Sequence, residues 1–267
     1  MIALLDVYRA FFKNEIALQL QYRVQLIIWL LFGVIQPVMY LVIWSTVARS
    51  RGGQVGDYGV SEFAAYFIAI MLVQHLVFTW IMYEFEFLIR QGQLSVRLLR
   101  PIDPIHGHIV ENLTYKLLTL TIMVPAAAIL TLLFQPRFDT PLWAIAVAVP
   151  ALLLAFLLTF LLEWSFALVA FWTTRTAALN DAYTLVYMFM SGWVAPLSLF
   201  PPGLQVLASI LPFRWALAFP VELLLGRLTP QQALGGLAAQ AVWLAIAVAI
   251  WKLTWRAGIR RYSAVGA

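Results

Sequence analysis

The chain has 267 residues, of which 63% are apolar and only 11% are charged, and its formal net charge is +5. About a quarter of the residues of a soluble domain are charged. Charged side chains are needed to cover the water-exposed surface of a chain of this length. The composition therefore excludes a soluble enzyme and a disordered chain. The absence of cysteine excludes disulfides, thiol nucleophiles and thiolate metal sites.

Residues 1–23 precede the first long apolar run and carry an amphipathic pattern. Over 4–14, Leu4, Tyr8 and Phe11 share one face of a helix, while Arg9 and Lys13 share the other. We predict a helix that lies in the membrane interface. A short helix packed on the protein is the alternative.

Apolar runs long enough to cross a bilayer then recur along the chain, since a spanning helix needs about 20 mostly apolar residues. We therefore predict an all-α integral membrane protein with a single transmembrane domain over residues 1–267. The six predicted spans are residues 24–47, 63–83, 117–134, 142–172, 182–200 and 237–255.

The segment 84–116, after the second span, is charged and carries two prolines. Glu86 and Arg90 are spaced to pair at i and i+4 on an extension of that span. Gly92 then breaks the helix, and Pro101 ends a short basic, partly apolar helix over 94–100. Such a helix suits docking to another protein, and an ordinary solvated loop is the alternative.

Few residues suggest chemistry, and we predict no catalytic or metal-binding residues. His106 and His108 are spaced for a metal, but Asp103 and Glu111 are the only carboxylates near them in the sequence. The sequence has no phosphate-binding loop, no nucleophile elbow and no zinc-protease motif. Its basic residues are spread over several short loops, which argues against nucleic-acid binding.

Two polar residues fall inside predicted spans. His75 lies in the second span, where a polar group faces the bundle interior or a water-filled path, or bonds to a neighbouring helix. Glu163 lies about 31 Å along its helix if that helix begins at Leu142, and near its middle if it begins near Pro150. One such carboxylate gives little support for ion coupling.

The segment 201–236 is apolar on average but carries Pro212, Arg214, Pro220 and Glu222. Two prolines and two charges are costly in a lipid-facing span. We therefore predict an external re-entrant hairpin of two short helices. With six spans, twelve of the seventeen Lys and Arg residues lie on the side of the termini, which places both termini in the cytoplasm.

The order of these elements resembles the membrane (permease) subunits of type-2 ABC transporters, in particular the bacterial drug-export-like subfamily. Residues 92–101, Gly-Gln-Leu-Ser-Val-Arg-Leu-Leu-Arg-Pro, are similar to the cytoplasmic loop of those permeases. Residues 196–202, followed by Leu-Pro-Phe-Arg at 211–214, are similar to the run that leads into their external hairpin. The resemblance covers nearly the whole chain.

The resemblance implies the fold of a type V ABC exporter. A second permease, identical or a sister chain, would pair with this one among membrane lipids, and cytoplasmic ABC ATPase subunits would bind ATP and Mg. This chain would hold no cofactor and would not be an enzyme. It would export small hydrophobic or cationic compounds, or a lipid-like molecule, across the bacterial inner membrane. An ion-coupled secondary transporter or channel is the alternative.

The resemblance also assigns roles to residues of this chain, with helix packing as the alternative for those of the pathway. The coupling helix would comprise Leu94, Arg97, Leu98, Leu99 and Arg100. The substrate pathway would include Gln74, His75, Thr79, Met190, Ser191 and Trp193. The external gate would include Arg214 and Glu222.

Overall fold

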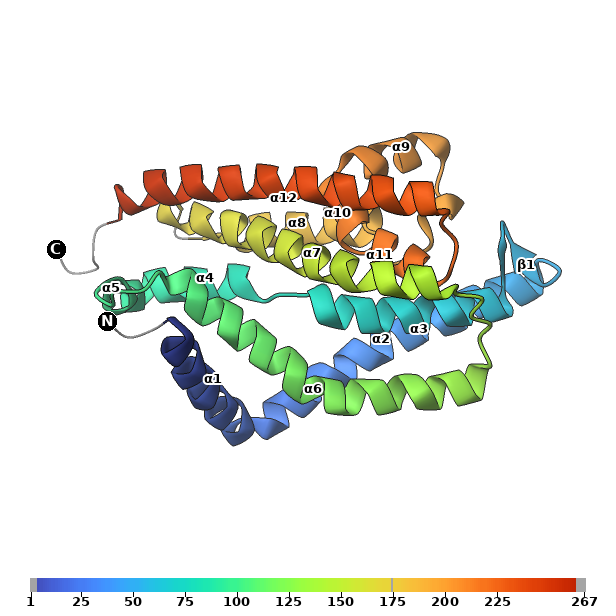
Figure 1. Ribbon diagram of the computed structural model, residues 1–267, viewed down its shortest axis with the longest axis horizontal. Coiled ribbons are helices and arrows are strands. Elements are labelled where there is room, and N and C mark those ends of the chain that lie inside the picture. The colour runs from blue at the N-terminus through green and yellow to red at the C-terminus, as the bar shows by residue number, and fades with distance from the viewer. Residues whose placement is uncertain (1–3, 174, 263–267) are drawn as a thin grey trace.

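The computed structural model describes residues 4–173 and 175–262, and almost all of their regular structure is helical (Figure 1). The elements are α1 Leu4–Gln21, α2 Arg23–Ser50, β1 Gln54–Val55, β2 Tyr58–Gly59, α3 Val60–Val77, α4 Ile81–Arg90, α5 Gln93–Leu98, α6 Pro104–Phe134, α7 Leu142–Ala167, η1 Leu168–Phe171, α8 Ala177–Met190, η2 Leu197–Leu199, α9 Pro202–Ile210, α10 Pro212–Ala216, α11 Ala218–Leu224 and α12 Pro230–Ile259.

Five helical stretches of the described chain are long and apolar enough to span a membrane: α2, α3 with α4, α6, α7 with η1, and α12. The segment from α9 to α11 meets the same test as a pair of helices bent by 73° at Leu211, either as a broken span or as a re-entrant loop. The fold is thus that of an all-α integral membrane protein, as predicted from the sequence.

The helix of the predicted fifth span differs from its expected bounds. Helix α8 begins five residues earlier and ends at Met190, ten residues before the predicted end. The chain then turns at Gly192, whose φ of 87° is unfavourable for residues with a side chain. The hydroxyl of Tyr66 donates to the carbonyl of Gly192 at 2.6 Å, and a Cβ on this glycine would lie 2.8 Å from that hydroxyl oxygen.

The two ends of the molecule carry different elements (Figure 1). Helices α1 and α5 and the last turns of α12 lie at one end, which we call the α5 end. The hydroxyls of Ser95 and Tyr262 are 2.8 Å apart there, and Tyr8 contacts His106 at 2.7 Å. The β1–β2 hairpin and the segment from α9 to α11 lie at the opposite end, which we call the hairpin end.

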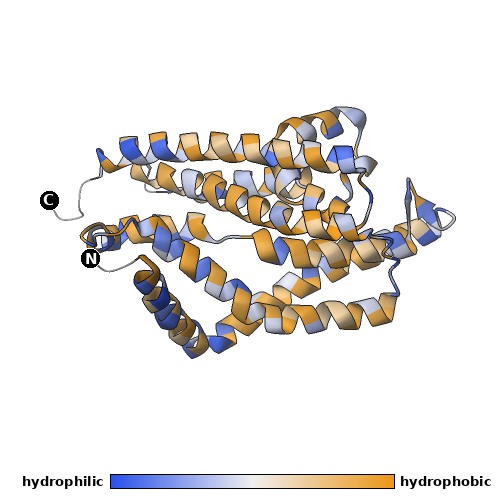
Figure 2. Cartoon of the chain, in the orientation of Figure 1, coloured by the Kyte–Doolittle hydropathy of each residue, from blue (hydrophilic) through white to orange (hydrophobic). Residues whose placement is uncertain are grey.

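The spans differ in how deeply the rest of the chain covers them. In the most apolar stretch of α3–α4, 72% of the residues are buried, and in that of α7 the share is 50%. The corresponding shares are 17% for α2 and 22% for α6. Apolar residues nevertheless run along all of these helices, whereas hydrophilic residues gather on α1 and toward the two ends (Figure 2). The uncovered apolar faces of α2 and α6 are those expected to meet lipid or another chain.

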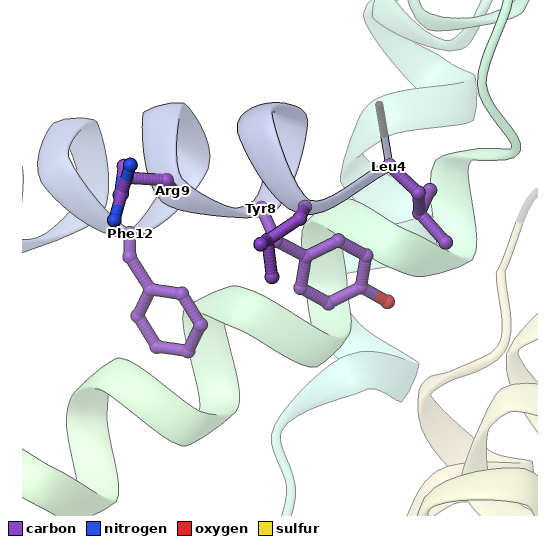
Figure 3. Close-up of a pocket in the computed structure, with 5 residues that line it drawn as sticks. Leu4, Tyr8, Arg9 and Phe12 are labelled. Atoms are coloured by element: carbon purple, nitrogen blue, oxygen red, sulfur yellow. The ribbon is translucent and has the colours of Figure 1, made fainter. Parts of the chain in front are cut away.

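Helix α1 packs against α6, with Tyr8 and Phe12 pointing toward it (Figure 3). Gln19 also donates to the carbonyl of Glu111 on α6 at 3.1 Å. The helix continues seven residues beyond the predicted amphipathic stretch, to Gln21. A shallow surface pocket of about 470 Å³ follows its first turns and is lined by Leu4, Leu5, Tyr8, Arg9 and Phe12.

Candidate functional site

The second predicted span, residues 63–83, is interrupted near its C-terminal end, between α3 and α4. Residues Phe78 to Trp80 are not helical, and Phe78 has an extended ψ of 141°. An interruption inside a membrane frees backbone groups that must find other partners. The carbonyl of Phe78 accepts a hydrogen bond of 2.5 Å from Nζ of Lys116 on α6. The hydroxyl of Thr79 donates to the carboxylate of Glu163 on α7.

Lys116 and Glu163 are both buried, although each is an ionisable residue inside a long apolar helix. Each takes a different partner at the interruption, and the Lys116 ammonium also lies 5.1 Å from the ring centre of Phe156. Helix α7 begins at Leu142, so Glu163 lies about 31 Å along it and not near its middle. Ionisable groups buried within membrane-spanning helices are costly and mark functional positions in membrane proteins. Three spans are therefore tied together at the one place where the second span loses its helix.

A cavity of about 630 Å³ opens beside this interruption, with walls formed by residues of α1, α2, α3, α4, α6, α7 and α8. Four residues of the predicted substrate pathway line it: Gln74, His75, Thr79 and Trp193. The other two are not among its lining residues. Ser191 is fully buried, and Met190 packs against the main hydrophobic core and against a small cluster of Leu197, Ala208 and Ala218.

The polar pathway residues of α3 also bond to neighbouring helices. Tyr187 of α8 donates to Oε1 of Gln74 at 2.8 Å, and His75 Nε2 lies 3.0 Å from the hydroxyl of Thr119 on α6. The helix-to-helix hydrogen bond considered for His75 is therefore present, and His75 lines the cavity as well. The amide nitrogen of Gln74 has no partner and is left as a donor at the cavity wall.

The cavity wall combines aromatic rings with carboxylates. The aromatic residues are Tyr22, Trp29, Phe32, Phe78, Trp80, Tyr83, Tyr115, Tyr183, Tyr187 and Trp193. The carboxylates are Glu15, Glu84, Glu111 and Glu163. Cavities that hold small molecules commonly have this volume and an apolar, aromatic lining with a few polar groups.

The short helix predicted over 94–100 is present as α5, but it ends at Leu98, so Leu99 and Arg100 directly follow it. Gly92 with a φ of 68° turns the chain into α5 from α4. Leu94 is fully buried and anchors the helix, whereas Leu99 is 86% exposed and Arg100 is also exposed. Leu98 is partly buried against the core. The helix is thus fixed on one face by Leu94. The exposed Leu99 and Arg100 directly after it form a free edge, which is both apolar and basic.

Arg97 connects α5 to the helices on either side of it. Its guanidinium lies 3.5 Å from Glu84 of α4 and 2.9 Å from Nε2 of His108 on α6. His108 Nδ1 in turn lies 3.4 Å from Glu84 and 3.5 Å from Glu111. Glu84, His108 and Glu111 place potential metal ligands within 4.8 Å of one another. Arg97 lies beside this cluster and forms an ion pair with Glu84.

Two other sequence predictions can be located. Glu86 and Arg90 form the expected pair at 3.4 Å. Arg214 and Glu222, the predicted gate residues, lie 3.4 Å apart on α10 and α11 at the hairpin end.

Two residues of the candidate site were not identified from the sequence. Lys116 entered only the count of Lys and Arg residues that set the membrane orientation. Glu84 was not identified, because the fold brings this residue to His108 across 24 positions of sequence.

Comparison with known proteins defines the class. A family model described as ABC-2 family transporter protein matches residues 34–266. The chain therefore belongs to this family, the membrane subunits of type-2 ABC transporters. In this family the chain is a transport subunit, and ATP hydrolysis belongs to partner ABC ATPase subunits on separate chains. No curated protein matches the sequence.

Proposed function

We propose that this chain is the membrane subunit of an ATP-driven exporter in the bacterial cytoplasmic membrane, with both termini in the cytoplasm. Its substrate would be a small hydrophobic or cationic compound, or a lipid-like molecule. The single observation that carries the proposal is the aromatic cavity of about 630 Å³ beside the interrupted second span, inside a chain of the ABC-2 family.

The α5 end supports the proposed coupling to an ATPase. There α4 continues from the interruption to Arg90, and α5 follows after the turn at Gly92. A push on α5 would therefore act through α4 on the residues that border the cavity. The exposed Leu99 and Arg100 form the edge that a partner ATPase would contact, with ATP and Mg bound on that partner.

The pathway and gate assignments follow from the same proposal. Gln74, His75, Thr79 and Trp193 would contact substrate, because they line the cavity. The Arg214–Glu222 pair would hold the outer hairpin closed until substrate is released. A second permease, identical or a sister chain, would cover part of the exposed apolar faces of α2 and α6.

An ion-coupled secondary transporter is the second candidate, and the buried Glu163 is the observation that favours it. Carboxylates within spans serve as proton or ion sites in carriers of that class. A carrier of that kind needs no ATPase, so the two candidates predict different partners.

Co-purification separates the two candidates. The tagged chain would be extracted from its own host in mild detergent, and the eluate analysed by mass spectrometry and by an ATPase assay. The exporter proposal predicts a stoichiometric ABC ATPase with measurable ATP hydrolysis, and a second permease if the complex is a heterodimer. Recovery of this chain alone, with no ATPase, would contradict the proposal and favour the carrier.

A further inference from the structure

The cavity wall carries acidic residues but no basic ones of the lysine or arginine type. Among the described residues that line the cavity, the acidic side chains are Glu15, Glu84, Glu111 and Glu163, and none is a lysine or arginine. The chain as a whole has the opposite balance, with 17 Lys and Arg residues against 12 Asp and Glu. The acidic lining is therefore not a consequence of overall composition.

The nearest basic side chains contact the carboxylates or the backbone and do not line the cavity. Arg97 approaches Glu84 at 3.5 Å and is not part of the lining. Lys116 donates to the Phe78 carbonyl and lies beside Phe156, again outside the lining. The interior of the cavity is thus bordered by carboxylates, while their positive neighbours stay within the protein.

The carboxylates occupy two levels of the cavity. Glu84 and Glu111 lie at the α5 end, where both approach the same nitrogen of His108. Glu15 of α1 belongs to this level, and its pKa is raised by burial and then by the negative charges of Glu111 and Glu84. Glu163 lies further along, at the interruption of the second span, where it accepts from Thr79.

Aromatic rings lie between and around these carboxylates. Trp80 stacks on Tyr83 with ring centres 4.9 Å apart, and Trp29 lies 5.3 Å from Trp80. Trp80 and Trp29 are each 48% exposed, so part of each ring remains free. The faces of such rings attract cations, and their area also binds apolar groups.

We propose that the cavity selects amphipathic organic cations of low molecular weight, with Glu163 holding the cationic centre and the aromatic wall holding the apolar body. The carboxylates at the α5 end would attract the cation to the entrance. Anions of equal size would be repelled, because a field of one sign acts more strongly in a site shielded from water. This inference rests on the proposed function as a transport subunit and narrows its substrate class.

The test compares ions of matched shape and opposite charge. The purified full-length chain, in nanodiscs, would be titrated with radiolabelled tetraphenylphosphonium and tetraphenylborate, and with ethidium as a planar cation. Binding to empty nanodiscs would be subtracted. We expect saturable binding of the cations and none of tetraphenylborate. Equal or tighter binding of tetraphenylborate, or no saturable binding of either cation, would overturn the proposal.

Matched variants locate the selectivity in the cavity. Glu163→Gln keeps the shape and an acceptor for Thr79 but removes the charge, and should weaken cation binding by about tenfold or more. Glu62→Gln changes an acid of α3 that is not part of the cavity lining, and should leave binding unchanged. Equal losses in both variants, or no loss in Glu163→Gln, would contradict the role of Glu163.

A second pair of variants carries little risk of misfolding, because Trp80 is half-exposed. Trp80→Phe should retain most of the cation affinity, and Trp80→Leu should lower it by about threefold or more, since only an aromatic face attracts the cation. Equal affinity in the two variants would contradict the aromatic part of the proposal. None of these titrations needs the ATPase. Failure here together with recovery of an ATPase complex would therefore reject the substrate class and leave the proposed function intact.

Discussion

The inner and outer walls of the cavity are built differently. The inner wall, from α3, α4 and α7, is tightly covered by the rest of the chain and carries the interruption, Thr79 and Glu163. The outer wall, from α2, has only 17% of its most apolar stretch buried and contributes rings and amides. Ionised groups can be held inside a membrane only where neighbouring helices supply partners for them. The contrast therefore indicates that the inner wall is the more rigidly held part of the candidate site.

The largest effect on stability should come from Lys116 on α6. Lys116→Met would leave the Phe78 carbonyl without its donor and remove a positive charge near the buried Glu163. We expect a loss of about 3 kcal/mol in the free energy of unfolding. Thermal unfolding in detergent would measure it, with the exposed Lys252→Met as the matched control.

A double variant sharpens this prediction. Adding Glu163→Gln to Lys116→Met removes the second buried charge, and we expect part of the lost stability to return. If Lys116→Met and Lys252→Met unfold at the same temperature, Lys116 does not support the interruption.

Truncating isoleucine on each wall should give smaller and unequal effects. Ile70 of α3 is fully buried, and Ile70→Ala should cost about 2 kcal/mol through lost packing. Ile35 of α2 is 50% exposed, and Ile35→Ala should cost less than about 0.5 kcal/mol in the isolated chain. Thermal unfolding of both variants in one detergent checks this. Equal losses would remove the distinction between the walls.

Hydropathy was sufficient to predict much of the fold. A helix in a bilayer satisfies its backbone polar groups internally, and it needs about 20 mostly apolar residues to cross. The runs over 24–47, 117–134 and 237–255 lie inside the long helices α2, α6 and α12. The interruption at Phe78 to Trp80 was not predictable, since the sequence has no proline or glycine there. Two residues distant in sequence hold it: Lys116 donates to the freed carbonyl of Phe78, and Glu163 accepts from the side-chain hydroxyl of Thr79.

The candidate site was predicted only in part, for related reasons. The family resemblance assigned Gln74, His75 and Thr79 to the pathway, and all three line the cavity. Met190 and Ser191 fall outside it because α8 ends at Met190 and the chain turns at Gly192. The acidic lining comes from carboxylates of α1, α4, α6 and α7, and their convergence depends on tertiary packing that no local pattern shows.

The most direct test of the account is ATP hydrolysis by the co-purified complex when the free edge of α5 is changed. Leu99→Asp with Arg100→Glu alters exposed side chains and should leave insertion and folding intact. We expect it to abolish the stimulation of ATP hydrolysis by tetraphenylphosphonium, whereas Arg260→Glu, an exposed change after α12, should preserve it. Unchanged stimulation in the α5 variant would contradict the assignment of α5 as the element that couples the cavity to ATP hydrolysis.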